Sequence, residues 1–95
     1  MIDQEFEYRR VRHGERVLAQ TLAGEAVLLD LKSERYFGLD RTGTRVWQLI
    51  DEMGDVQQIF AALVAEYDAP PQKIADDLRA LLGRLVAEGL VQPDA

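Results

Sequence analysis

The 95-residue chain contains no cysteine and only one histidine, His13. The absence of cysteine excludes disulfides, thiolate nucleophiles and cysteine-ligated zinc, and a single imidazole cannot build a histidine metal cluster. Hydroxyl nucleophiles are also scarce, since the chain has Ser33 and three threonines but no readable catalytic triad. We therefore expect no metal, no cofactor and no enzymatic activity.

Long apolar runs are absent as well, because no stretch approaches the roughly 20 residues that span a bilayer. The opening MIDQEFEYRR carries acidic charge and no apolar stretch, so it does not resemble a secretory signal peptide. These two absences predict a chain outside the membrane, with the cytoplasm as its default location. The 47% hydrophobic content suffices for one modest core, so we expect a single domain over residues 1–95.

Basic residues are outnumbered, 11 against 17 acidic ones, which gives a formal net charge of −6. Nucleic acid is not expected as the main partner, because phosphate binding depends on lysine and arginine displacing condensed counterions. One basic cluster is present, at Arg9, Arg10, Arg12 and Arg16. It is typical of a solvated, charged lead-in segment over residues 1–16, and the alternative is an arm that attracts an acidic partner.

The first half of the chain favours β-structure. Two runs rich in β-favouring residues, 17–22 and 26–31, are joined by a glycine-containing turn. After the second turn, KSER, Tyr36 and Phe37 favour a third strand, and Gly38 marks its end or a close backbone approach. We expect three antiparallel strands, the third of which is about four residues long.

Amphipathic helices follow, with apolar residues at helical spacing. The first is expected over about residues 40–53, where Asp40 or Thr42 caps its start and Gly54 ends it. The second opens at Asp55, in a sequence typical of a capping box, and ends before DAPP.

The third helix is expected to start at Pro70 or Pro71, because prolines cannot lie inside a helix but suit its first turn. It should run to about Glu88, and the closing GLVQ should add a short extended segment.

Strands followed by helices predict an α+β fold, and this inventory is typical of a winged helix-turn-helix with a three-stranded antiparallel sheet. A DNA-reading version would need a basic third helix, whereas this one mixes basic and acidic residues.

A series of short motifs runs from the second expected strand to the end of the last helix. They are an aliphatic Leu-Leu-Asp-Leu strand at 28–31, an aromatic pair at 36–37, Leu-Asp at 39–40, Val-Trp at 46–47, Tyr-Asp at 67–68, Asp-Leu at 77–78 and Gly-Leu at 89–90. In this order and spacing the chain resembles the PqqD-like family, the small proteins and domains called RiPP recognition elements. The resemblance covers roughly residues 17–91, which is the expected core of the domain.

The resemblance implies a peptide-binding module that catalyses nothing. Such a module captures the leader segment of a ribosomally synthesised precursor and delivers it to modifying enzymes. In the family, the leader adds as an extra strand beside the third strand and lies in a groove closed by the third helix, and a short strand with one unpaired side suits such addition. The implied peptide-binding residues are Arg35, Tyr36, Phe37 and Gly38 in the strand and Lys73, Ile74, Asp77, Ala80, Leu81 and Arg84 in the helix.

Several of these residues have a plainer structural role open to them. Alternation sends Tyr36 and Phe37 to opposite faces, one into the core and the other to the groove, and the sequence does not decide which. Ile74 and Leu81 belong to the buried stripe of the helix as readily as to a groove. Asp77 can simply form an exposed ion pair with the lysine four residues earlier.

More than one biological setting fits the resemblance. The sequence favours the discrete recognition proteins of lasso-peptide clusters, whose partners are a leader peptidase and a cyclase, and similar proteins accompany radical enzymes. The alternative within the family is the peptide chaperone of pyrroloquinoline quinone biosynthesis. A winged-helix DNA-binding protein or an adaptor for a protein partner shares the same layout. An open strand edge also permits a homodimer when no peptide is present.

Overall fold

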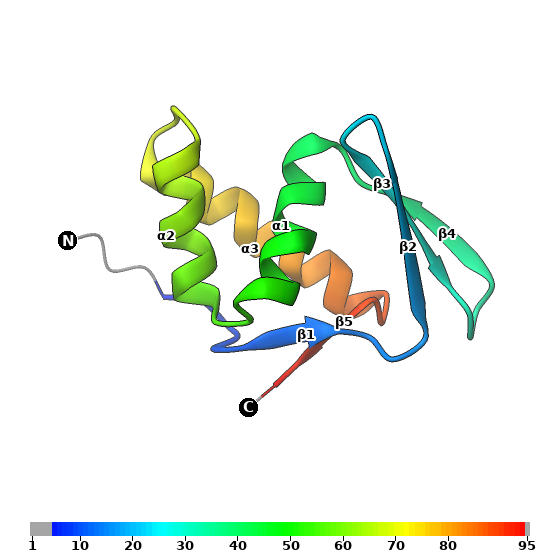
Figure 1. Ribbon diagram of the computed structural model, residues 1–95. Helices are drawn as coiled ribbons and strands as arrows, with labels where there is room; N and C mark the ends of the chain where they lie inside the picture. Colours follow the sequence, from blue (N-terminus) through cyan, green and yellow to red (C-terminus); the bar gives the residue numbers. More distant parts are fainter. Residues whose placement is uncertain (1–4, 95) are drawn as a thin grey trace.

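A computed structural model describes residues 5–94 as three helices and two small sheets. The elements are β1 (Val11–His13), β2 (Val17–Leu22), β3 (Glu25–Asp30), β4 (Arg35–Gly38), α1 (Arg41–Glu52), α2 (Val56–Glu66), α3 (Pro71–Ala87) and β5 (Val91–Pro93). Figure 1 shows the helices grouped together, with the β2–β3–β4 sheet at one side and the β1–β5 pair beneath them. The expected α+β fold, with a three-stranded antiparallel sheet and three helices, is confirmed.

The β2–β3–β4 sheet is an antiparallel meander whose tight turns follow from the residues in them. Ala23 and Gly24 both have positive φ angles, the backbone of the two-residue turns that match strand twist. In the next turn, the carboxylate of Asp30 accepts hydrogen bonds from the Lys32 amide and the Ser33 hydroxyl. These bonds hold the pKa of Asp30 below its usual range.

The two faces of this sheet differ in burial. Ala26 and Leu28 of β3 point toward the helices and are fully buried, and Leu28 is 0% exposed. The opposite face keeps large apolar side chains in solvent, including Leu18, Leu22 and Tyr36. Only a narrow strip of the sheet is therefore held by the hydrophobic core.

Helices α1 and α2 begin where short polar side chains cap them, whereas α3 begins at Pro71 without a side-chain cap. The Asp40 carboxylate accepts a hydrogen bond from the Gly43 amide at 2.7 Å, and Asp55 accepts one from the Gln58 amide at 3.0 Å. Of the two caps considered for the first helix, Asp40 is thus the one used. No helix within residues 5–94 is long and apolar enough to cross a membrane.

A second sheet, β1 paired with β5, was not expected from the sequence. Val11 lies opposite Pro93 and His13 opposite Val91, so the closing extended segment is a strand whose partner lies near the start of the chain. The interpretation of residues 1–16 as a solvated lead-in segment is wrong for 11–13, because Val11 is only 2% exposed. Residues 1–4 of that segment lie outside the described part of the chain.

Polar contacts join both sheets to α1. The buried Thr44 hydroxyl oxygen accepts a hydrogen bond from the Ala26 amide at 2.8 Å, which fixes β3 to the helix. On the other side, the His13 ring stacks on Trp47 with a centroid distance of 3.6 Å and bonds through Nε2 to the Trp47 carbonyl oxygen. Helix α1 is therefore the shared support of the two sheets.

Candidate functional site

Strand β4 pairs with β3 on one side, and within residues 5–94 no strand lies on its other side. The Leu39 amide donates a hydrogen bond to the Ala26 carbonyl oxygen at 2.8 Å, which continues the β3–β4 pairing by one residue. This bond identifies which residues of β4 form hydrogen bonds to β3. In an antiparallel pair the hydrogen-bonded positions alternate, so Phe37 directs its N–H and C=O to β3. Tyr36 and Gly38 therefore direct theirs to the open edge.

The structure separates the aromatic pair that the sequence left unresolved. Phe37 is half-buried and packs against the core, while Tyr36 lies on the outer face and is 70% exposed. The guanidinium of Arg35 lies 5.2 Å from the centroid of the Phe37 ring. Phe37 and Arg35 thus face the helices, and Tyr36 offers its backbone to the edge rather than a side chain to the groove.

Gly38 has no neighbour that would require a glycine. A Cβ placed on it would meet nothing within 4 Å, so the room beside this residue is open. The protein's own packing therefore does not account for the glycine at this position.

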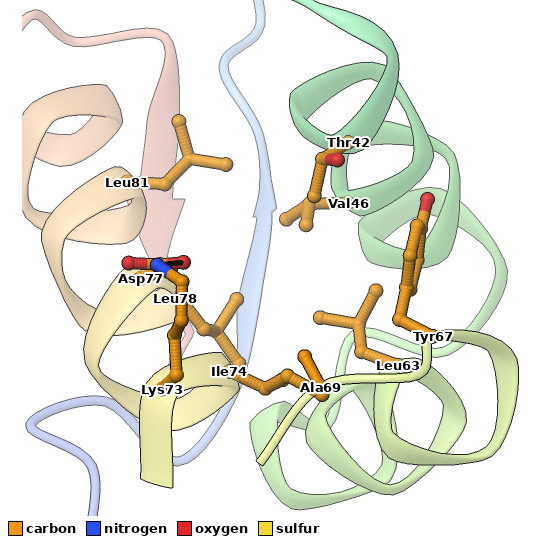
Figure 2. Close-up of a pocket in the computed structure, with 10 residues that line it drawn as sticks. All are labelled: Thr42, Val46, Leu63, Tyr67, Ala69, Lys73, Ile74, Asp77, Leu78 and Leu81. Carbon is orange, nitrogen blue, oxygen red and sulfur yellow. Dashed lines mark hydrogen bonds and ion pairs between the residues drawn. The ribbon is translucent and has the colours of Figure 1, made fainter. Parts of the chain in front are cut away.

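A pocket lies between α1, the end of α2 and α3, with a volume of about 170 Å³ (Figure 2). Its base is aliphatic and its rim polar, with the Lys73–Asp77 ion pair on one side at 3.0 Å. We call it the inner pocket, lined by Thr42, Val46, Leu63, Tyr67, Ala69, Lys73, Ile74, Asp77, Leu78 and Leu81. Because its base is aliphatic, this space suits an apolar side chain.

A second hollow, of about 450 Å³, connects the inner pocket to the end of β4. We call it the β4–α3 groove, and it is lined by Gly38, Leu39, Asp40, Thr42, Gly43, Asp77, Leu81 and Arg84. Thr42, Asp77 and Leu81 line both spaces, so the two adjoin, and we refer to them together as the depression.

The residues expected in α3 are not all brought to this depression. Lys73, Ile74, Asp77 and Leu81 line the inner pocket, and Arg84 lines the β4–α3 groove. Ala80 is exposed and lines neither space. Ile74 is buried in the core as well, so its core and pocket roles are compatible.

Six residues of the inner pocket were not anticipated as site residues, namely Thr42, Val46, Leu63, Tyr67, Ala69 and Leu78. Val46 and Leu63 fit the apolar stripes of their helices, so their spacing alone indicates core packing. Tyr67 stands at the end of α2 in one of the family's short motifs, which was the available signal that this residue has a further role.

The charges of α3 are mostly paired with each other. Lys73 pairs with Asp77 at 3.0 Å and Arg79 with Asp76 at 2.9 Å, so this helix does not present a row of free cations. Residues 5–94 also contain no group of three side chains suited to holding a metal ion. The inner pocket is thus mainly aliphatic, with a paired lysine and aspartate at its rim.

Comparison with known proteins agrees with this geometry. A family model described as Coenzyme PQQ synthesis protein D (PqqD) matches residues 25–91, well over half of the sequence. The chain belongs to the PqqD family. Comparison with curated proteins finds no match.

Two solved structures are similar to this PqqD-family protein. One is TbiB1 in complex with the TbiA(beta) leader peptide, 33% identical, with a TM-score of 0.82 over 88% of this chain and 98% of that one. The other is a lasso peptide synthetase B1 complexed with its leader peptide, 23% identical, with a TM-score of 0.79 over 88% and 99%. The second likeness is one of fold.

Proposed function

We propose that this protein binds the leader segment of a ribosomally synthesised precursor peptide as an added strand on β4. The observation that carries the proposal is the open edge of β4 beside a groove that leads into the inner pocket. The protein catalyses nothing itself and delivers the bound precursor to modifying enzymes.

The backbone of β4 supplies the affinity. Tyr36 and Gly38 each offer one N–H and one C=O to a guest strand, and each hydrogen bond gained is worth about 0.5–1.5 kcal/mol net. Specificity comes from side chains, because alternate residues of the guest point toward Phe37 and the helices. A large aliphatic or aromatic residue beyond the strand fills the inner pocket.

A lasso-peptide system is the favoured setting. Its support is the similarity to TbiB1, which was solved with a leader peptide and which this chain matches at 33% identity over nearly its whole length. The partners are then a leader peptidase and a cyclase, and the exchange takes place in the cytoplasm, where the precursor is made. The name of the matching family model supports the alternative, a peptide chaperone in pyrroloquinoline quinone biosynthesis.

Fluorescence polarisation with a labelled TbiA(beta) leader peptide, alongside a quinone-cofactor precursor, tests the proposal. Gly38→Pro removes an N–H that points to the open edge and leaves the bonds from Phe37 and Leu39 to β3 intact. We expect at least a tenfold loss of affinity, with an unchanged melting temperature.

Gly38→Ala is the matched control, since its Cβ meets nothing and its N–H is kept. It should bind like the wild type. Equal binding by the proline and alanine variants, or no binding of any leader by the folded wild type, contradicts strand addition at β4.

A further inference from the structure

One face of α3 is turned toward β4 and carries an ordered set of charges. Asp77, Leu81, Arg84 and Glu88 are spaced by four, three and four residues, which places them on one side of the helix and its C-cap. The first three line the β4–α3 groove, and Glu88 forms an ion pair with Arg35 at the start of β4, at 3.3 Å. This stripe is the wall that a peptide on β4 would lie against.

The acidic groups that share the helix face or the groove with Arg84 have other partners. Glu88, four residues later, is the usual partner for Arg84 on a helix, but its carboxylate is held by Arg35. Asp77 is paired with Lys73 at 3.0 Å, and Asp40 accepts the capping bond from Gly43.

Arg84 consequently forms no ion pair within residues 5–94, although it lines the groove. A guanidinium beside a peptide-sized channel is suited to a carboxylate, which it binds through two parallel hydrogen bonds. A guest strand would also cover this contact and reduce its screening by solvent.

We propose that Arg84 is a specificity-determining residue that pairs with an Asp or Glu side chain of the bound peptide. The inference rests on the proposed function and names one chemical feature of its ligand. The acidic residue lies where the guest passes between Gly38 and α3. Because the whole protein carries a net charge of −6, carboxylates elsewhere in the peptide are disfavoured. An acidic residue is therefore preferred at this one position of the peptide.

Arg35 acts as a positioning residue in this arrangement. It draws Glu88 toward β4, where the guanidinium also lies over the Phe37 ring, and so keeps Glu88 from neutralising Arg84. Removing Arg35 frees Glu88 to compete with the peptide carboxylate. Removing Glu88 as well should cancel that competition.

Selection from a displayed library of random peptides provides the test. Wild-type protein should enrich peptides with Asp or Glu at one fixed position, and Arg84→Glu should enrich Lys or Arg there. A synthetic peptide from the selection should bind the wild type about tenfold more tightly than its Asn or Gln version, as expected for one charged hydrogen-bonded pair. Arg84→Gln should bind the two peptides within a factor of two.

Two further variants separate this role from a structural one. Arg35→Gln should reduce the preference for the acidic peptide, and Arg35→Gln with Glu88→Gln should restore it. Arg45→Gln, which breaks an ion pair between α1 and α2 outside the groove, is the matched control and should keep the preference.

The outcomes distinguish the two proposals. If no enriched peptide loses its binding to the Gly38→Pro variant, strand addition at β4 is wrong, and this inference is wrong with it. If enriched peptides do lose binding to Gly38→Pro but have the same charge preference with wild type and with Arg84→Glu, strand addition stands and the role of Arg84 is wrong.

Discussion

The β1–β5 sheet and the β2–β3–β4 sheet are both small, but they are held in different ways. Val11 and Val91 of the first are almost fully buried, and its strands contact α1 and α3. In the second, β2 is exposed along most of its length, and only Ala26 and Leu28 are fully buried, while Val17 and Phe37 are partly buried against the core. One sheet is part of the scaffold, whereas the other is attached to the scaffold mainly through its central strand, β3.

This difference explains how a protein of 95 residues can offer an open strand and still fold. Most of the buried apolar residues lie in the helices and in the β1–β5 pair, and the β1–β5 pair lines neither the β4–α3 groove nor the inner pocket. The β2–β3–β4 sheet contributes less to the core and keeps its backbone groups available at β4. Regions that bind by adding a strand are expected to be among the less protected parts of a structure.

Replacing Leu28 by alanine should have the largest effect, because it removes the main apolar attachment of the β2–β3–β4 sheet. Leu28 is 0% exposed, and buried leucine-to-alanine changes cost about 2–5 kcal/mol in the free energy of unfolding. Leu22→Ala, in a side chain 69% exposed on the same sheet, should cost less than about 0.5 kcal/mol. Chemical denaturation of both variants measures the contrast, and equal losses would show that the two faces are not distinct.

Glycine-to-alanine changes beside the two sheets should have an intermediate effect on the free energy of unfolding, and this effect should differ between the sheets. At Gly14, after β1, a Cβ would lie 2.8 Å from the Gly89 carbonyl oxygen, so backbone must shift, at a cost of about 1–3 kcal/mol. At Gly38, at the end of β4, the same atom meets nothing and the cost should be near zero. Thermal unfolding followed by circular dichroism compares them, and a larger loss at Gly38 would reverse the assignment of scaffold and open edge.

The smallest effect on the free energy of unfolding is expected from an ion pair between helices α1 and α2. Arg45 donates hydrogen bonds to the Glu66 carboxylate at 2.8 Å, which holds the pKa of Glu66 below its ordinary value of 4.5. A lowered pKa means that the pair stabilises the fold above about pH 4.5 and that this contribution is lost as the pH falls through the folded-state pKa.

Glu66→Gln should therefore reduce stability by a few tenths of a kcal/mol at pH 7 and low salt, because the pair is partly exposed. Urea titrations of both proteins at pH 7 and at pH 3 measure the difference. A gap that stays the same at pH 3 would show that the ion pair is not its cause.

The elements with a strong local pattern could be predicted from the sequence. The expected strands at 17–22 and 26–31 and the capped helix starts at Asp40 and Asp55 agree with the structure to within one residue. Strand β1 could not be predicted, because its three residues, Val-Arg-His, are too few to show a periodicity and their partner lies about 80 residues later. Its formation depends on the packed helices that bring the two segments together.

The site was predictable in outline but not in the direction of its side chains. The short third strand and the helix opposite it followed from the family resemblance. Which aromatic residue faces the helices depends on the register that Ala26 and Leu28 impose on β3, and the sequence of β4 alone does not contain this information. The inner pocket needs three helices at once, so Thr42 and Tyr67 joined it only in the folded structure.

The pairing of β1 with β5 also closes the chain between Arg10 and Asp94 into a ring. Val11 lies opposite Pro93, and the Asp94 amide donates to the Arg10 carbonyl oxygen at 2.8 Å, so the two strands lie side by side beneath the helices (Figure 1). A short linker could join residue 94 to residue 10, and the tight turn at Ala23 and Gly24 offers a place for new termini. Strands β1 and β5 both lie away from β4 in Figure 1, so such a linkage would leave the edge for a guest strand accessible.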